Sequence, residues 1–309
     1  MQGTDIVPEE HGDSCNMGQL SRAPKVSIGM PVYNGAKYIR QTLDSIVGQT
    51  YTDFEVIISD NGSIDETDVI CCEYAQNDNR IRYYPNSQNR GAAWNFNRVF
   101  QLARGIYFKW AAHDDLLAPE MIERCVHSLD SHPDAVVCFP LTKAIDQSGN
   151  VLRAYPSKPG GKSSLPHERF YEFVCVPHPC VAVFGLIRTH ELAKTRLMGT
   201  FPSADRQLLG ELSLLGQFYE IPEHLFFYRN HAEQSWQKYP TKMALRAWYD
   251  PGHVTNWAFP QWRLLIEHFC SIARVKLAWN ERLYCVCYLM YWVRLNWRLL
   301  ASNLVLKEA

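Results

Sequence analysis

The chain has 309 residues, and its 31 Lys and Arg against 32 Asp and Glu give a formal net charge of −1. This balance argues against a basic nucleic-acid-binding protein and against an acidic disordered tail, so no nucleic-acid partner is expected. With 47% hydrophobic and 13% aromatic residues, the chain is globular and can bury one large core or two smaller ones.

The cysteines and the N-terminal segment bear on the compartment. Ten cysteines are scattered without the density of a disulfide scaffold or a paired C-x-x-C spacing, which favours a reducing, cytoplasmic location. Residues 1–24 lack the apolar stretch of a secretory signal, and we interpret them as a mobile leader. No apolar run reaches the roughly 18 residues of a membrane span.

From Lys25 onward, short β-rich segments alternate with segments of helical periodicity, which predicts an α/β protein. We expect a Rossmann-like, mostly parallel sheet flanked by helices over residues 25–235, and a C-terminal helical region over residues 236–309, where strand signals almost cease. The expected strands are 26–32, 54–59, 81–84, 106–112, 135–140 and 181–187; the expected helices are 37–47, one after 63, 92–103, one from Pro119, and 204–215.

Two local signals refine this outline. Ser63-Ile64-Asp65-Glu66 has the form of a capping box, in which Ser and Glu satisfy each other's free amides at the start of a helix. Residues 155–166 contain three prolines and Gly160-Gly161, which favours a surface loop.

Polar residues follow three of the predicted strands. Pro31-Val32-Tyr33-Asn34-Gly35, Ser59-Asp60-Asn61-Gly62-Ser63 and Ala112-His113-Asp114-Asp115 each stand where a strand ends. Ligands of open α/β sheets bind beyond the carboxyl ends of the strands, where loops converge and helix N-termini face inward. One such acidic strand end is ordinarily a turn or an N-cap, but the three together predict a ligand site.

Asp114 and Asp115 form the most informative pair. Adjacent carboxylates after a buried strand repel each other unless a cation or solvent relieves them, and they lie too early to cap the helix at Pro119. Mg²⁺ or Mn²⁺ bound by one or two carboxylates together with substrate phosphates is the natural partner.

At this point the sequence resembles a known family. PVYNGAKYIRQTLDSIVGQTYTDFEVIISDNGSID and NRGAAWNFNRVFQLARGIYFKWAAHDDLLAPE are similar to segments of family 2 inverting glycosyltransferases, which have the GT-A fold, and the likeness extends over about residues 25–230. The resemblance implies that Pro31, Val32, Tyr33 and Asp60 hold the base and ribose of a nucleotide sugar, with Asp60 accepting an N–H of a uracil-like base, and that Asn34, Asn61 and Ser63 shape this pocket.

The resemblance also implies a metal site. The AHDD run stands where the family commonly has D-x-D or D-x-D-D, so Asp114 and Asp115 are expected to hold Mn²⁺ or Mg²⁺ and the diphosphate. Ala112 departs from that motif, and which of the two aspartates binds the metal is left open. His231, in YRNHAEQS, is the expected third ligand, because neutral imidazole suits Mn²⁺-like ions.

The expected reaction also needs a base. Inversion at an anomeric carbon proceeds by direct attack of an acceptor hydroxyl, whose proton a carboxylate removes as the bond forms. Asp205 begins a helix and shares a face with its leucines, so its carboxylate is expected to face the body of the protein. The resemblance assigns the base to an acidic residue here; Glu211 is the fallback, and a plain first-turn acid is the structural alternative.

The C-terminal region is rich in Trp, Tyr, Leu and Arg. Such a composition suits either a helix that lies in a membrane interface, or a helical pair that closes over the catalytic domain or forms a homo-dimer contact. The sequence does not choose between these.

The sequence therefore predicts a metal-dependent inverting glycosyltransferase that moves a sugar from a nucleotide donor, UDP-linked, to a glycan or a lipid-linked acceptor. Two other functions compete with it. One is a non-catalytic nucleotide-sugar or glycan-binding module, which the altered motif at Ala112 would suit. The other is a nucleotidyltransferase, disfavoured because no Gly-rich basic loop follows the first strand.

Overall fold

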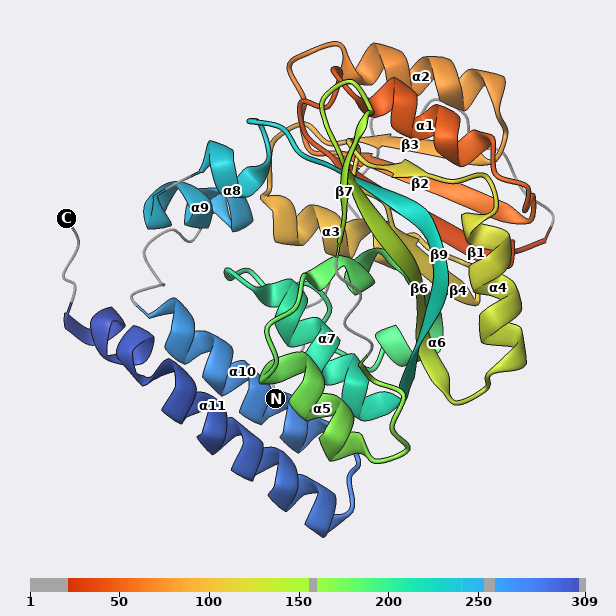
Figure 1. Ribbon diagram of the computed structural model, residues 1–309. Helices are drawn as coiled ribbons and strands as arrows, with labels where there is room; N and C mark the ends of the chain where they lie inside the picture. Colours follow the sequence, from red (N-terminus) through yellow and green to blue (C-terminus); the bar gives the residue numbers. More distant parts are fainter. Residues whose placement is uncertain (1–21, 156–159, 240, 253–258, 306–309) are drawn as a thin grey trace, which may run out of the picture.

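The computed structural model describes residues 22–155, 160–239, 241–252 and 259–305, and a mixed sheet of nine strands lies at its centre (Figure 1). The strands are β1 (Val26–Val32), β2 (Phe54–Asp60), β3 (Ile81–Pro85), β4 (Tyr107–Trp110), β5 (Leu116–Leu117), β6 (Ala135–Ile145), β7 (Val151–Ala154), β8 (Leu186–Arg188) and β9 (Gln217–Arg229). Their order is β3-β2-β1-β4-β8-β6-β9-β5, and β7 pairs with β6.

Pairing is parallel from β3 through β4 and again between β6 and β9. The short strand β8 is antiparallel to both of its neighbours, and β5 is antiparallel to β9. All seven residues of β1 and all seven of β2 are buried, because helices cover both faces of this part of the sheet. The predicted α/β sheet flanked by helices is confirmed.

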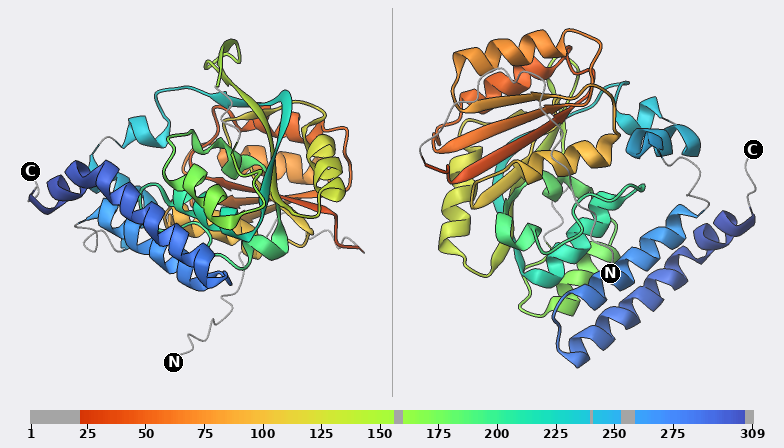
Figure 2. Two further views of the ribbon diagram at one scale, coloured as in Figure 1. Left: turned by 60° about the horizontal axis from the view of Figure 1, so that its bottom comes forward. Right: turned by 180° about the vertical axis from the view of Figure 1, so that it is seen from behind.

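Two layers of helices enclose the sheet (Figures 1 and 2). One hydrophobic core lies between the sheet and α1, α2 and α4, and the other between the sheet and α3, α5 and α7, onto which α10 and α11 pack. The helices are α1 (Ile39–Val47), α2 (Thr67–Asn77), α3 (Ala92–Gln101), α4 (Met121–Ser131), α5 (Pro166–Val174), η1 (Cys180–Phe184, a 3₁₀ helix), α6 (Thr189–Leu192), α7 (Ala204–Leu215), α8 (Ser235–Lys238), α9 (Lys242–Tyr249), α10 (Pro260–Arg274) and α11 (Trp279–Val305).

Three details differ from the expectation. Helix α2 forms, but without the predicted capping box: its N-cap residue Glu66 makes no side-chain cap, Asp65 accepts from the Thr67 amide, and the Ser63 hydroxyl bonds Asp60. Residues 181–187 are not one strand but the end of η1 followed by β8, and Pro166 begins α5 instead of ending a loop. Residues 1–21 of the predicted leader and residues 156–159 of the predicted loop lie outside the described residues.

The C-terminal region is helical, as expected, and α10 and α11 form a hairpin on the outside of α5 and α7 (Figures 1 and 2). Two polar contacts fasten it: Arg274 forms an ion pair with the buried Glu211 of α7, and Glu281 bonds the backbone amide and ring of His167. A domain boundary near residue 235 stays a prediction. Within the described part of the chain, no helix combines the length and apolar character needed to cross a bilayer.

Candidate active site

A cavity of about 240 Å³ opens at the carboxyl ends of β1 and β4. Most of the site residues predicted from sequence line it, and they come from loops that the parallel register places side by side. These are Pro31, Val32, Tyr33, Asn34, Asn61, Asp114, Asp115 and His231.

Asp60 and Ser63 are not among the residues that line this cavity. Both oxygens of the buried Asp60 carboxylate are engaged: Oδ1 accepts from the Ser63 amide and hydroxyl, at 3.0 and 2.6 Å, and Oδ2 accepts from the Tyr83 hydroxyl at 2.8 Å. Ser63 Oγ in turn accepts from the Asn34 amide at 2.8 Å. The ends of β1 and β2 are therefore one hydrogen-bonded unit.

Two asparagines complete this unit. Asn34 has a φ of 52°, and its Oδ1 accepts from the Ile64 amide at 2.9 Å. Asn95, on α3, donates from Nδ2 to the carbonyl oxygens of Val32 and Ser59 at the ends of the two strands. Asn adopts the left-handed backbone conformation more readily than most residues do. Asn34 can therefore make the bend after β1 and still accept a hydrogen bond from the Ile64 amide.

The pairing of β5 with β9 places Asp114 and Asp115 beside the end of β9. Asp115 Oδ1 accepts from the Arg229 amide at 2.9 Å, and Arg229 Nε donates to the Asp114 carbonyl at 2.7 Å. Arg229 is fully buried, and its guanidinium lies 4.9 Å from the ring centroid of Tyr38. It fixes the backbone that carries the two aspartates.

The two carboxylates differ electrostatically. Burial, reinforced by the charge of Asp114, raises the pKa of Asp115 well above its usual range. Burial also acts to raise the pKa of Asp114, but the neighbouring His113 and the hydrogen bond with His231 outweigh it and lower that pKa. Asp114 is thus the member of the pair that carries the negative charge.

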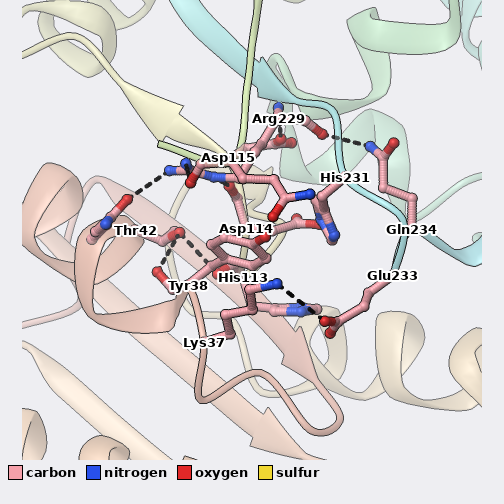
Figure 3. Close-up of polar contacts among 12 residues, drawn as sticks. Lys37, Tyr38, Thr42, His113, Asp114, Asp115, Arg229, His231, Glu233 and Gln234 are labelled. Carbon is pink, nitrogen blue, oxygen red and sulfur yellow. Dashed lines mark hydrogen bonds and ion pairs between the residues drawn. The ribbon is translucent and has the colours of Figure 1, made fainter. Parts of the chain in front are cut away.

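His231 joins Asp114 across the cavity (Figure 3). Its Nε2 lies 2.8 Å from Asp114 Oδ2, and its ring contacts that of Tyr38 with 4.6 Å between centroids. Asp115 Oδ2 and His231 Nδ1 are buried without a hydrogen-bond partner. Among the residues that the structure describes, no three His, Cys, Asp or Glu side chains group as a metal cage. Asp114 Oδ2 and His231 Nε2 bond each other, so the two could hold an ion, completed by phosphate oxygens and water, once this contact opens and the imidazole is neutral at Nε2.

Several residues of the wall are absent from the sequence-based prediction. They come from the segment after β9 and from α8 and α9: Glu233, Gln234, Lys238, Tyr239 and Trp248. Glu233 forms an ion pair with Lys37 of the opposite wall, 3.2 Å long (Figure 3). The composition shift near residue 235 is the one sequence signal at this place, but it does not indicate which side chains turn inward.

A second cavity, of about 450 Å³, lies on the other side of η1. Phe184 lines the first cavity, whereas Val181 and Ala182 line the second, so this short helix separates the two. The second wall is rich in aromatic rings and carboxylates: Phe139, Tyr155, Tyr171, Phe173, Tyr288, Glu168, Glu172 and Glu220.

Asp205 lies near two residues, Cys180 and Tyr249, whose chain neighbours line the second and the first cavity respectively. It is half-buried in the first turn of α7, outside the described wall of either cavity, and its carboxylate contacts the Cys180 thiol at the start of η1. Burial, with the charge of Asp205, raises the pKa of Cys180 to about 12 and also raises the pKa of Tyr249. Tyr249 follows Trp248, which lines the first cavity.

Glu211, the fallback base, has a structural role instead. It is fully buried, forms an ion pair with Arg274, and its Oε2 accepts from Gln207 at 2.9 Å and from Ser271 at 3.2 Å. These contacts join α7 to α10, which leaves no exposed carboxylate oxygen for a substrate. Two buried side chains of β4 donate to carbonyls outside the sheet: Lys109 to Phe184 of η1, and Trp110 to Phe96 of α3.

The fold and the cavity together define a class: an α/β protein with a GT-A-type fold, whose cavity lies beyond the carboxyl ends of parallel strands. The sequence places it further. Residues 27–187, just over half of the chain, match the model of glycosyl transferase family 2, and the chain belongs to this family.

Relatives with similar sequences share part of the chain. A glycosyltransferase of Rickettsia typhi is 36% identical over 137 residues, which are 44% of this chain and 42% of that protein. Chondroitin synthase of Escherichia coli is 35% identical over 133 residues, 43% of this chain and 19% of the synthase. The matched segment is thus less than half of each relative.

Solved structures agree on the fold. TarS 1–349 of S. aureus superposes with a TM-score of 0.65 at 16% identity, over 92% of this chain and 75% of that one. Mannosyltransferase PcManGT of Pyrobaculum calidifontis, in complex with GDP-Man and Mn²⁺, gives a TM-score of 0.52 at 15% identity, over 94% of this chain and 77% of that one. The predicted GT-A fold is confirmed.

Proposed function

We propose that the chain is an inverting, metal-dependent glycosyltransferase that moves a sugar from a UDP-linked donor to a hydroxyl of a glycan or of a lipid-linked acceptor. The observation that carries this proposal is that the loop ends of β1 and β2 and the Asp114–His231 pair line one cavity. Such a cavity suits a nucleoside bound at one end and a diphosphate at the other.

The choice of nucleotide rests on Asp60. Asp60 lies buried behind the residues that line the cavity. Its carboxylate accepts three hydrogen bonds, from the Ser63 amide and hydroxyl and from Tyr83, which leaves capacity for one further N–H and suits uracil with its single ring N–H. Among the fold neighbours, TarS has been solved with UDP and with UDP-GlcNAc, and PcManGT with GDP-Man. Since this fold accepts both nucleotides, the choice falls to Asp60 and its neighbours.

For the metal we propose Asp114 and His231 as ligands and Asp115 as a positioning residue, because Asp115 is buried and bonded to the Arg229 amide. When bound, Mn²⁺ or Mg²⁺ offsets the negative charge that develops on the departing diphosphate. Tyr38 supports the imidazole of His231, and Arg229 fixes the backbone at Asp114.

Asp205 is our candidate base. The acceptor oxygen attacks the anomeric carbon as the bond to the diphosphate oxygen breaks, and the hydroxyl proton passes to the Asp205 carboxylate; attack from the opposite side inverts the configuration. Its place beside η1, between the two cavities, supports this role. The second cavity then takes the sugar of the acceptor, with rings that stack on its faces and carboxylates that accept from its hydroxyls.

The test is a panel of nucleotide sugars incubated with Mn²⁺, Mg²⁺ or Ca²⁺, with release of free nucleotide as the readout. We expect a UDP-sugar to give UDP in the presence of metal, and NMR of a transferred product to show the inverted anomer. Binding of nucleotides with no release from any donor would identify a binding module instead, and release of pyrophosphate would identify a nucleotidyltransferase.

A further inference from the structure

Helix α11 lies on the outside of the molecule (Figures 1 and 2) and exposes several large apolar side chains. Its inner side packs on α5 and α10 through Cys285, Leu289, Trp292 and Leu300. Its outer face, as named here, consists of Trp279, Leu283, Tyr284, Met290, Tyr291, Leu295 and Trp297 with Arg294 and Arg298. Trp279 is 78% exposed and Trp297 is 57% exposed. Apolar area of this extent on a water-soluble domain indicates an interaction site.

The outer face has an ordered pattern. Trp279, Leu283, Met290 and Trp297 follow one another at spacings of four and seven residues and form one stripe; Tyr284, Tyr291 and Leu295 form a second. At 100° per residue, Arg294 and Arg298 project between the two stripes. A band of cations flanked by aromatic and aliphatic side chains is therefore presented along the helix.

The charge on this face has one sign. Glu281 is the only acidic residue in Trp279–Val305, and its carboxylate is held by His167 on the inner side. Arg294 and Arg298 form no ion pair among the described residues; Arg298 instead lies 5.5 Å from the ring centroid of Trp297. The partner of this face must supply negative charge and accept apolar rings.

A second copy of this chain offers apolar side chains but does not supply the negative charge. In a two-fold contact the same face meets itself, which brings arginines toward arginines with no carboxylate to neutralise them. An anionic lipid surface meets both, because Trp and Tyr rings favour the headgroup layer and arginines reach the phosphates with their stems on the acyl boundary.

We propose that the outer face of α11 docks the enzyme on an anionic membrane surface, with the helix lying in the interface and not across the bilayer. The inference stands on α11 alone and does not depend on the proposed donor, metal or base. It places the molecule on the membrane by one edge, with α4 and β7 away from the lipid (Figure 2).

The test is sedimentation of the full chain with vesicles of phosphatidylcholine, or of phosphatidylcholine mixed with phosphatidylglycerol. We expect binding only to the mixed vesicles, with a blue shift of tryptophan fluorescence. Arg294→Glu with Arg298→Glu should weaken binding at least about tenfold, and Trp279→Ser with Trp297→Ser should abolish the blue shift on binding. Arg124→Glu with Arg153→Glu, the same charge change on exposed residues of α4 and β7, is the matched control and should bind as the wild type does.

Two results would overturn the proposal. One is equal binding of the wild type and the Arg294/Arg298 variant to the mixed vesicles. The other is a dimer in analytical ultracentrifugation that the Trp279/Trp297 variant converts to a monomer, which would make this face a self-association surface. Circular dichroism of each variant confirms folding, and since all four side chains are exposed, unchanged melting is expected.

Discussion

The two cavities on either side of η1 are built in different ways. The first is made of loops that leave neighbouring strands and are tied together by Asp60, Ser63, Asn34 and Asn95. The second joins β6, α5 and η1 to the distant helix α11, and these elements meet through side-chain packing. Hydrogen bonds between neighbouring strand ends fix the shape of the first cavity, so it suits the invariant part of a nucleotide sugar. Changes in side-chain packing are enough to reshape the second cavity, so it suits a variable acceptor.

The largest effect is expected where the two cavities meet. Asp205→Asn removes the proposed base and leaves the donor cavity intact, so transfer should fall about 10²- to 10⁴-fold while nucleotide affinity changes little. Steady-state transfer rates and calorimetry with UDP measure the two quantities.

Asp134→Asn, an exposed aspartate remote from both cavities, is the matched control and should keep full activity. Wild-type turnover in the Asp205 variant would show that Asp205 is not the base. The proposal that the reaction takes place between a donor cavity and an acceptor cavity would then have no catalytic residue to support it.

A smaller effect should separate Asp114 from Asp115. Asp114→Asn should weaken UDP binding about 10- to 100-fold in Mn²⁺ and leave metal-free binding unchanged. Asp115→Ala should keep the dependence on Mn²⁺ but lower the melting temperature, because it removes the acceptor of the Arg229 amide. Calorimetry with and without Mn²⁺ is the measurement, and equal wild-type affinities in the two conditions would contradict a metal at this site.

The sequence predicted elements well where a pattern had a single interpretation. The first strand, Val26–Val32, and the helix Ala204–Leu215 have the predicted bounds. The capping box failed because a tertiary contact, with Asp60, engages the Ser63 hydroxyl. The apolar run 181–187 failed because such a run does not distinguish a buried strand from a helical turn.

The candidate site divides in the same manner. Strand ends are visible in a sequence, so Asp114 and the loop after β1 could be identified, and register then brings them together. The contribution of α8 and α9 could not be identified from the sequence. Tyr239 and Trp248 reach the cavity because the chain after β9 folds back over it, and no local sequence pattern predicts that course. Nor could Glu211 be separated from Asp205, because their difference is burial against α10.

The packing of α5 on α10, behind the second cavity, should make the stability of the protein depend on pH. Helix α5, which forms part of the wall of that cavity, contacts His268 of α10 through Phe170, with 5.9 Å between ring centroids. Burial lowers the pKa of His268 to about 3, so below its unfolded value of about 6.5 the unfolded chain takes up a proton that the native protein does not. The unfolding free energy should therefore fall as the pH drops from 6.5 toward 3, by about 2 kcal/mol at pH 5 from this group.

Urea unfolding of the wild type and of His268→Leu at pH 7.5 and pH 5 tests this. The wild type should lose about 2 kcal/mol more than the variant over this interval, because leucine carries no titrating group. Equal losses would show that His268 is protonated in the folded protein and that burial at α10 does not set the acid stability of this side.

The smallest effect is expected from removing a single aromatic ring of the second cavity. This change tests most directly whether the two cavities bind different substrates. Tyr171 lines this cavity and its ring lies 4.8 Å from that of Tyr288. Tyr171→Ala should raise the KM for the acceptor roughly 2- to 10-fold, the value of one aromatic contact, with the KM for the donor unchanged; Tyr171→Phe, which keeps the ring, should retain most of the affinity. A rise in the donor KM instead would mean that the two cavities are one continuous donor site, because a ring that contacts only the acceptor cannot alter binding of the nucleotide.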